Sequence, residues 1–237
     1  MSHLFLRANA VRWREERTWD VDGATLLLVR ARRAGTERRQ LVGAGPVEQL
    51  ASAVGQAAAD GVGRVDFGLL TRGTWDLVGA ARDRLALTAG PGWDWMWTRT
   101  PPPVQPGEER VGPVTGEGAA DEVRACLDRA YPETSADPGD PDLRWWGYRD
   151  NSGTLRGVVG VNAPDGAPVH LSGLGTDVAW RRRGIGSAMM AAVTRWALAE
   201  HPLVHYGIWA DNDAARRIYT RLGYAVGQEI ENLRPVA

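Results

Sequence analysis

The sequence predicts an α/β fold in which a mixed sheet carries helices on both faces. Three observations lead to this prediction. In the C-terminal half, the first strands are joined by short turns, as in hairpins. The later strands of that half alternate with helical segments. A proline-rich linker at residues 101–107 separates residues 1–100 from residues 108–237, because consecutive prolines fit neither a helix nor a central strand.

The elements of residues 108–237 follow from local patterns. Val123, Leu127 and Ala130 recur at helical spacing, and the turn sequence 150–153 separates two apolar strands. Gly223 is the expected left-handed cap of the last helix. In order, we expect a strand at 110–115, a helix at 121–130, strands at 145–148, 155–162 and 169–178, a helix at 184–199, a strand at 204–210, a helix at 213–222 and a strand at 224–232.

Composition and charge exclude several classes of function. The 28 basic and 29 acidic residues nearly balance, which argues against a general nucleic-acid or membrane-surface binder. All of those basic residues are arginine, and without lysine neither a phosphate-binding loop of nucleotide hydrolases nor Schiff-base chemistry is possible. Cys126 is the only cysteine, so an internal disulfide and a cysteine zinc cluster are excluded.

The sequence also predicts where the protein works. No run of about 18 or more apolar residues occurs, so no membrane-spanning helix is expected. The first residues lack the apolar core of a signal peptide. We therefore expect a soluble, cytoplasmic protein without a metal ion, a nucleic-acid partner or a membrane partner.

The main chemical motif is Arg181-Arg182-Arg183-Gly184-Ile185-Gly186, which follows a predicted strand and opens a predicted helix. Its glycines let a ligand approach the backbone, and the N–H groups at a helix start bind anions. The motif therefore indicates a diphosphate-binding turn, although a basic, glycine-capped loop fits the hexamer as well. A dinucleotide-binding fingerprint is disfavoured, because Met189 stands at the position of its third glycine.

A second segment 26 residues further on completes a family pattern. The hexamer fits the loop Gln/Arg-x-x-Gly-x-Gly/Ala of the GCN5-related N-acetyltransferase (GNAT) family. The next helix of that family reads Asn-x-x-Ala-x-x-x-Tyr-x-x-x-Gly-Phe/Tyr, and the matching residues here are Asn212, Ala215, Tyr219, Gly223 and Tyr224. On these two motifs, residues 108–237 resemble a GNAT domain, and the resemblance implies the GNAT fold for this half.

The resemblance implies a site for acetyl-coenzyme A, the cosubstrate of the family, and no metal. The diphosphate would lie on the N–H groups of residues 182–187, and the pantetheine arm would follow the strand that contains Gly173 and Gly175. Glycine inside a strand indicates a bulge, and in the family a bulge here separates two parallel strands to admit the cosubstrate. The N–H of Leu174 could polarise the thioester carbonyl. The residues expected to contact the cosubstrate are Leu174, Gly175, Thr176, Arg181, Arg182, Arg183, Gly184, Ile185, Gly186, Ser187 and Asn212.

The resemblance also assigns the proton-transfer groups. Tyr219 matches the usual proton donor of the family, and the alternative is that it fills the core. The usual carboxylate position on the strand before the asparagine motif corresponds to Gly207, and another corresponds to His170. The candidates for the general base are therefore His170, His205 or a chain of water molecules, since histidine accepts a proton at neutral pH.

Residues 1–100 contain a weaker copy of the pattern. Residues 40–45, Gln-Leu-Val-Gly-Ala-Gly, fit the loop, and they stand between an apolar strand at 25–29 and a helical stretch at 46–59. A strand at 64–70 and a short helix at 74–82 would follow. This half resembles a truncated GNAT domain that has lost its catalytic residues, although a chance similarity and an unrelated α/β cap stay open.

Together these features predict an acyltransferase that moves an acetyl group from acetyl-coenzyme A to a primary amine of a small molecule, by direct attack in a ternary complex. Two alternatives stay open: a protein or peptide N-acetyltransferase, and a non-catalytic acetyl-coenzyme A-binding module. A monomer and a homodimer are both compatible with the sequence, and several acyl lengths and acceptors are as well.

Overall fold

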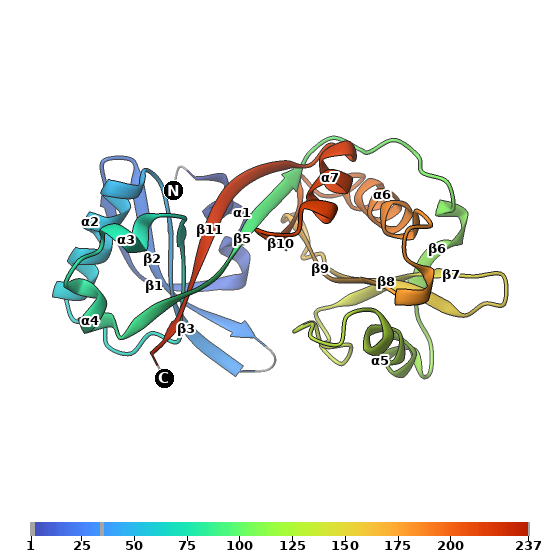
Figure 1. Ribbon diagram of the computed structural model, residues 1–237, viewed down its shortest axis with the longest axis horizontal. Helices are drawn as coiled ribbons and strands as arrows, with labels where there is room; N and C mark the ends of the chain where they lie inside the picture. Colours follow the sequence, from blue (N-terminus) through green and yellow to red (C-terminus); the bar gives the residue numbers. More distant parts are fainter. Residues whose placement is uncertain (1–2, 34–35, 237) are drawn as a thin grey trace. The chain divides into compact units, whose positions relative to one another are not determined.

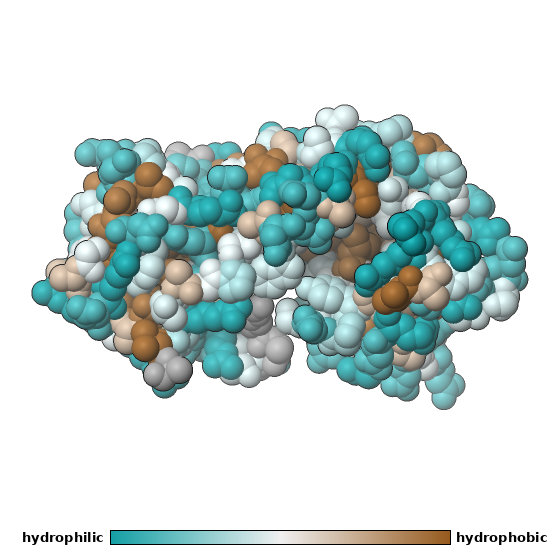
Figure 2. Space-filling view, in the orientation of Figure 1, coloured by the Kyte–Doolittle hydropathy of each residue, from teal (hydrophilic) through white to brown (hydrophobic). Residues whose placement is uncertain are grey.

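The computed structural model describes residues 3–33 and 36–236, drawn in Figure 1. The chain forms two compact units, each built from separate stretches of sequence. The first unit consists of Met1–Met96, Gly207–Asp213 and Val226–Ala237, and the second of Trp97–Tyr206 and Ala214–Ala225. Figure 2 shows hydrophilic residues over most of the visible face, whereas aliphatic side chains such as Leu41, Val54 and Val158 are fully buried.

The second unit contains the elements predicted for residues 108–206. They are β6 (Val111–Val114), α5 (Ala119–Ala130), β7 (Arg144–Arg149), β8 (Leu155–Asn162), β9 (Val169–Thr176), α6 (Ile185–Leu198), the first part of β10 (Val204–Trp209) and most of α7 (Asp213–Arg221), with short 3-10 turns η2 (Glu108–Arg110) and η3 (Val178–Trp180). The strands follow the order β10-β9-β8-β7-β6. The β9–β10 pair is parallel and the other pairs are antiparallel, so the predicted mixed sheet is confirmed.

Helices α5 and α6 cover opposite faces of this sheet, as Figure 1 shows for β8. Val158 belongs to a buried cluster with Cys126 and Leu127 of α5. A Cβ atom at the neighbouring Gly157 would lie 2.7 Å from Cε of Met189 in α6. Because successive residues of a strand point to opposite faces, the two helices pack on the two sides of β8.

The first unit contains three antiparallel strands followed by alternating helices and strands. Its elements are α1 (Leu4–Asn9), η1 (Ala10–Arg12), β1 (Trp13–Val21), β2 (Ala24–Arg33), β3 (Thr36–Ala44), α2 (Val47–Ala59), β4 (Phe67–Thr71), α3 (Thr74–Leu77), α4 (Ala81–Leu85), most of β5 (Leu87–Thr98) and most of β11 (Ala225–Pro235). The strand order is β1-β2-β3-β4-β11-β5. The strand predicted at 25–29 is thus preceded by another strand, and the helix predicted at 74–82 is divided into two short ones.

The units do not coincide with the predicted contiguous domains. The last strand, β11, belongs to the first unit, because it pairs antiparallel with β4 from Ile230–Thr71 to Leu233–Gly68. Leu233 is fully buried in the core of that unit. The proline-rich linker lies in the second unit, where the carbonyl of Pro102 accepts a hydrogen bond of 3.1 Å from Arg195 Nη1.

The prediction of a glycine-rich loop at residues 40–45 is wrong, because residues up to Ala44 belong to strand β3. A Cβ atom at Gly43 would lie 2.6 Å from Leu50 Cδ1, so this glycine lets α2 pack closely on the sheet. Gly45 has a φ of 140°, and a Cβ there would lie 2.5 Å from the Cα of Ala24. Both glycines are therefore explained by packing within the first unit.

Candidate active site

Helix α6 begins with a backbone arrangement suited to an anion. Gly184 precedes the helix with a φ of 80°, and Arg182 also has a positive φ of 64°. The first intrahelical bond runs from the Ala188 N–H to the Gly184 carbonyl, and no side chain caps the helix. The amides of the first turn thus keep the direction and the dipole that bind phosphate groups.

The space above this turn is open. A Cβ atom at Gly186 would have Thr176 Oγ1, at 3.9 Å, as its nearest neighbour, and a Cβ at Gly184 would meet no atom within 4 Å. Packing within the protein therefore does not require a glycine at position 186. A cradle that the protein leaves open beside helix amides fits the diphosphate of coenzyme A.

The three arginines of the motif have different surroundings. Arg181 donates to the carbonyl of Ala130 at the end of α5 (2.9 Å) and to the carbonyl of Thr176 (3.3 Å). The guanidinium of Arg183 lies 4.6 Å from the ring centre of Trp180. Arg182 is exposed. The side chain of Arg181 thus ties the turn to α5, and its predicted contact with the cosubstrate stays a prediction.

Strand β9 contains the predicted bulge. Between the pairs Val158–Gly175 and Gly160–Ser172 the register shifts, so that β9 has one residue more than β8. At the bulge Gly173 has a φ of 59°, and a Cβ there would lie 2.8 Å from the Cβ of Ala136. The sequence signal, a glycine inside a strand, therefore identified this bulge correctly.

The parallel pairing of β9 with β10 is short. It comprises Val169–Val204 and His170–His205, whereas β9 continues to Thr176. The predicted pantetheine contacts, Leu174 and Thr176, lie on this continuation and are half-buried. The end of strand pairing at His170 is consistent with the predicted course of the cosubstrate along β9.

Tyr219 lies in a buried cluster of three tyrosines. Its ring centre is 4.6 Å from that of Tyr206 in an edge-to-face arrangement, and Tyr206 meets Tyr224 in the same way at 5.2 Å. Burial raises the pKa of Tyr219, and a hydrogen bond from the Tyr206 hydroxyl opposes this rise. The Tyr219 phenol therefore stays protonated at neutral pH, as a proton donor requires.

The two histidine candidates face each other on neighbouring strands. His170 and His205 share the last parallel rung of β9 and β10, and their Nδ1 atoms are 3.4 Å apart. His205 is fully buried, and His170 is half-buried. At Gly207, a Cβ atom would lie 2.7 Å from the ring of Trp93, which occupies the space that a carboxylate side chain would need.

Asn212 precedes helix α7 and is exposed. Its backbone N–H donates to the carbonyl of Trp209 at 3.0 Å, and its predicted contact with pantetheine stays a prediction. Gly223 ends α7 with a φ of 86°, as the sequence predicted. Within residues 3–33 and 36–236, no group of three or more histidine, cysteine, aspartate or glutamate side chains could hold a metal ion, and no helix has the length and apolarity to cross a membrane.

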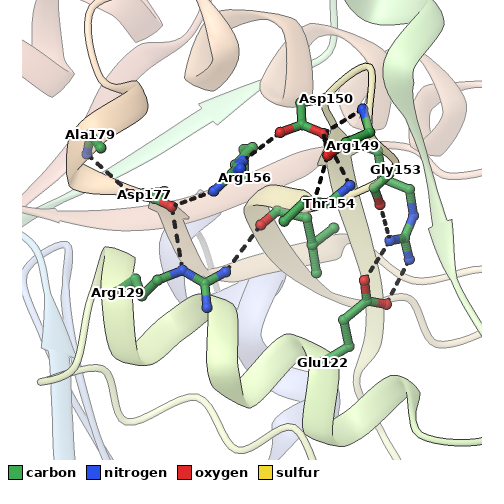
Figure 3. A network of polar contacts seen from close by, with 11 residues as sticks. Glu122, Arg129, Arg149, Asp150, Gly153, Thr154, Arg156, Asp177 and Ala179 are labelled. Atoms are coloured by element: carbon green, nitrogen blue, oxygen red, sulfur yellow. Dashed lines mark hydrogen bonds and ion pairs between the residues drawn. The ribbon is translucent and has the colours of Figure 1, made fainter.

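Asp177, directly after β9, is a buried charged residue that no motif in the sequence marks. Its buried carboxylate accepts hydrogen bonds from the N–H of Ala179 (3.1 Å), Arg129 Nε and Arg156 Nη1 (both 3.3 Å) (Figure 3). Burial raises the pKa of Asp177, but these hydrogen bonds together hold it below its ordinary value. The arginines are 48 and 21 positions away in sequence, so no local pattern marks this network.

The second unit has a cavity of about 530 Å³, and none of the predicted site residues lines it. It lies among β6, α5 and β7, and the side chains of Trp145, Trp146 and Trp196 contribute to its wall. It is therefore separate from the α6 turn that fits the diphosphate.

Comparisons with known proteins agree with this fold. Residues 117–224 match the Acetyltransferase (GNAT) family. The chain is similar in fold to a GCN5-related N-acetyltransferase from Kribbella flavida, with 19% identity, a TM-score of 0.61 and coverage of 100% of this chain and 97% of that chain. A GCN5-related N-acetyltransferase from Sphaerobacter thermophilus is 16% identical, with a TM-score of 0.56 and coverage of 91% and 82%.

A tandem GNAT protein from the clavulanic acid biosynthesis pathway has a TM-score of 0.50 and 14% identity, and the alignment covers 99% of this chain and 94% of that chain. At these identities the likeness concerns the fold. Among curated proteins, none matches the chain.

Proposed function

Because this chain carries a GNAT acetyltransferase domain at residues 117–224, we propose that it transfers an acetyl group from acetyl-coenzyme A to a primary amine of a small molecule. The start of α6 carries the proposal. There an uncapped helix, two backbone positions with positive φ and the open space at Gly186 occur together. This combination suits a diphosphate, and packing within the second unit does not require the glycine at position 186.

Acetyl-coenzyme A supplies an acetyl group that is activated as a thioester. The amides of residues 182–187 would hold its diphosphate, and Leu174, Gly175 and Thr176 of β9 would hold the arm. The peptide N–H of Leu174, at the bulge of β9, provides a hydrogen-bond donor of the kind that stabilises a developing negative charge on a carbonyl oxygen.

Two side chains would accept and donate the protons of the reaction. An alkylamine with a pKa of about 10 must lose a proton before it can attack, and His170 accepts that proton at a ring nitrogen. Tyr219 Oη holds the proton that the departing sulfur needs, since burial keeps the phenol neutral. In this mechanism the acetyl group moves directly to the amine, and no residue of the chain is acetylated.

The proposed acceptor is small because the chain shows no strong charge bias toward a macromolecule. The first unit would have no active site, since Gly43 and Gly45 are explained by packing and Pro46 removes an amide donor before helix α2. We place the protein in the cytoplasm, as a monomer or a homodimer.

A panel of primary amines, assayed by the release of the coenzyme A thiol from acetyl-coenzyme A, tests the proposal. We expect steady release with at least one small amine, and little release with peptides that have free N-termini or lysines. Binding of acetyl-coenzyme A without turnover of any amine would instead favour a non-catalytic module. Absence of binding in calorimetry would refute the cosubstrate site altogether.

A further inference from the structure

We propose that Asp177 is a positioning residue for the diphosphate-binding turn, and that Arg129 and Arg156 brace its carboxylate. The turn in question is the one assigned above to coenzyme A, so this inference rests on the proposed function. It concerns the residue between the end of β9 at Thr176 and the start of η3 at Val178.

Asp177 is held on both its side chain and its backbone. One carboxylate oxygen, Oδ1, accepts the N–H of Ala179, and the other, Oδ2, accepts from Arg129 and Arg156. Its own N–H donates to the carbonyl of Arg156 at 2.8 Å, and its carbonyl accepts the N–H of Trp180 at 2.8 Å. The carboxylate therefore fixes the first residues of η3 from one side, while β8 fixes the Asp177 backbone from the other.

The two arginines are themselves anchored, as Figure 3 shows. Arg129 donates to the carbonyls of Ala125 (2.7 Å), within its own helix α5, and Leu155 (3.2 Å), on β8. Arg156 donates from Nε to Asp150 Oδ2 at 2.7 Å. The Asp177 carboxylate is thus attached to two elements of the second unit that do not belong to the turn.

Contacts of Trp180 connect Asp177 and η3 with the diphosphate-binding turn. Trp180 is the last residue of η3 and directly precedes the arginine motif. The guanidinium groups of Arg156 and Arg183 lie 4.7 Å and 4.6 Å from the centre of its ring. Arg182 and Gly184 then take positive φ values. Ordering a turn of this kind before the ligand arrives lowers the entropy cost of binding, which is the role that we assign to Asp177.

Two substitutions at Asp177 distinguish the hydrogen bond from Ala179 from the hydrogen bonds of the two arginines. Asp177→Asn keeps an oxygen for the Ala179 N–H but replaces the acceptor of the two arginines with a donor, and Asp177→Ala removes both interactions. We expect calorimetry to show coenzyme A binding that is weaker by about threefold or more in Asp177→Asn and by about tenfold or more in Asp177→Ala. The KM for acetyl-coenzyme A should rise, with kcat at saturation changed by less than about twofold.

A second substitution provides a rescue. Asp177 has a ψ of 126°, an extended conformation that a following proline favours. Val178 is exposed and is the first residue of η3, a position at which proline needs no N–H and has a suitable φ. Asp177→Ala combined with Val178→Pro should therefore recover most of the lost affinity for coenzyme A, because proline restricts the same backbone in another way.

Glu122→Gln is the matched control. Glu122 forms two hydrogen bonds with Arg149 in the same region, at Nη1 (2.5 Å) and Nη2 (2.7 Å), but its carboxylate does not contact Asp177. This variant should lose a comparable amount of thermal stability and keep the coenzyme A affinity of the wild type. Equal affinity in wild type and Asp177→Ala would overturn the inference, as would a loss in Glu122→Gln as large as that in Asp177→Ala. Failure of the wild type to bind coenzyme A would instead refute the proposed function.

Discussion

At the scale of single residues, Tyr219 combines two properties that the sequence left as alternatives. It packs edge-to-face against Tyr206, as a core residue does, and burial keeps its phenol protonated, as a proton donor requires. A hydrogen bond from Tyr206 occupies an acceptor site on Tyr219 Oη. The packing of Tyr219 is therefore compatible with the proposed role of a proton donor.

Tyr219→Phe keeps the ring and its packing but removes the proton. We predict that kcat falls by about 10²-fold or more, with little change in the affinity for acetyl-coenzyme A. Tyr224→Phe is the matched control, because Tyr224 belongs to the same cluster and its hydroxyl bonds Thr194 Oγ1 at 2.5 Å. A turnover number for Tyr219→Phe within twofold of wild type would assign Tyr219 to the core alone.

At the scale of elements, helix α6 and strand β9 together build the proposed cosubstrate site. Glycine stands at positions 184 and 186 at the start of the helix for two different physical reasons. Gly184 has a φ of 80°, a conformation that strains any residue with a side chain. Gly186 has an ordinary helical place, with open space around its missing Cβ. Of these two glycines, only Gly184 is needed by the fold. A substitution at Gly186 therefore tests ligand binding without disturbing the fold.

Gly186→Val should place a branched side chain where the diphosphate rests. We predict that calorimetry shows coenzyme A binding to be lost, while the melting temperature changes little, because the nearest atom to the new Cβ is 3.9 Å away. Gly184→Val should instead lower the melting temperature, since it strains the backbone. Undiminished affinity in folded Gly186→Val would exclude this turn as the cosubstrate site.

At the scale of the whole molecule, the last strand decides the stability of the first unit. Leu233 of β11 is fully buried in that unit's core, and a Cβ atom at Gly68 would lie 2.8 Å from Leu233 Cδ1. Glu231 accepts hydrogen bonds from the N–H groups of Trp75 (2.5 Å) and Gly73 (3.3 Å). A fragment of residues 1–100 would lack all of these contacts.

Leu233→Ala should therefore lower the free energy of unfolding by about 2–5 kcal/mol, as measured by denaturant titration followed by circular dichroism. Leu77→Ala is a useful control, because Leu77 is 52% exposed and its truncation should change stability little. A loss of less than about 1 kcal/mol in Leu233→Ala would contradict the role of β11 in this core.

The full chain should bind one equivalent of coenzyme A. Gly43 and Gly45 of the first unit are required by packing, and Pro46 precedes helix α2, where it removes one amide donor. Calorimetric titration measures the stoichiometry directly, and Gly186→Val should reduce it to zero. Two equivalents for the wild type, or one remaining in that variant, would reveal a second cosubstrate site. Gly45→Val is unsuitable as a control, because its side chain would collide with Ala24.

The sequence by itself determined the features that depend on neighbours within a few residues. The helical spacing of α5 and α6, the hairpin turns and the cap at Gly223 are local patterns, because helix and strand periods are set by the backbone. The glycine–arginine motif and the Asn212–Tyr224 motif are local as well. These patterns were sufficient to predict the fold of the second unit, and the site residues that they indicate stay a prediction.

The tertiary structure alone decided which distant segments meet. Gly43 looked like part of a loop in sequence, but pairing of β3 with β2 and the approach of Leu50 make it a strand residue. The pairing of β11 with β4 and the network of Asp177 join residues far apart in the chain. Such contacts follow from burial and hydrogen bonding in three dimensions, and no period along the sequence encodes them.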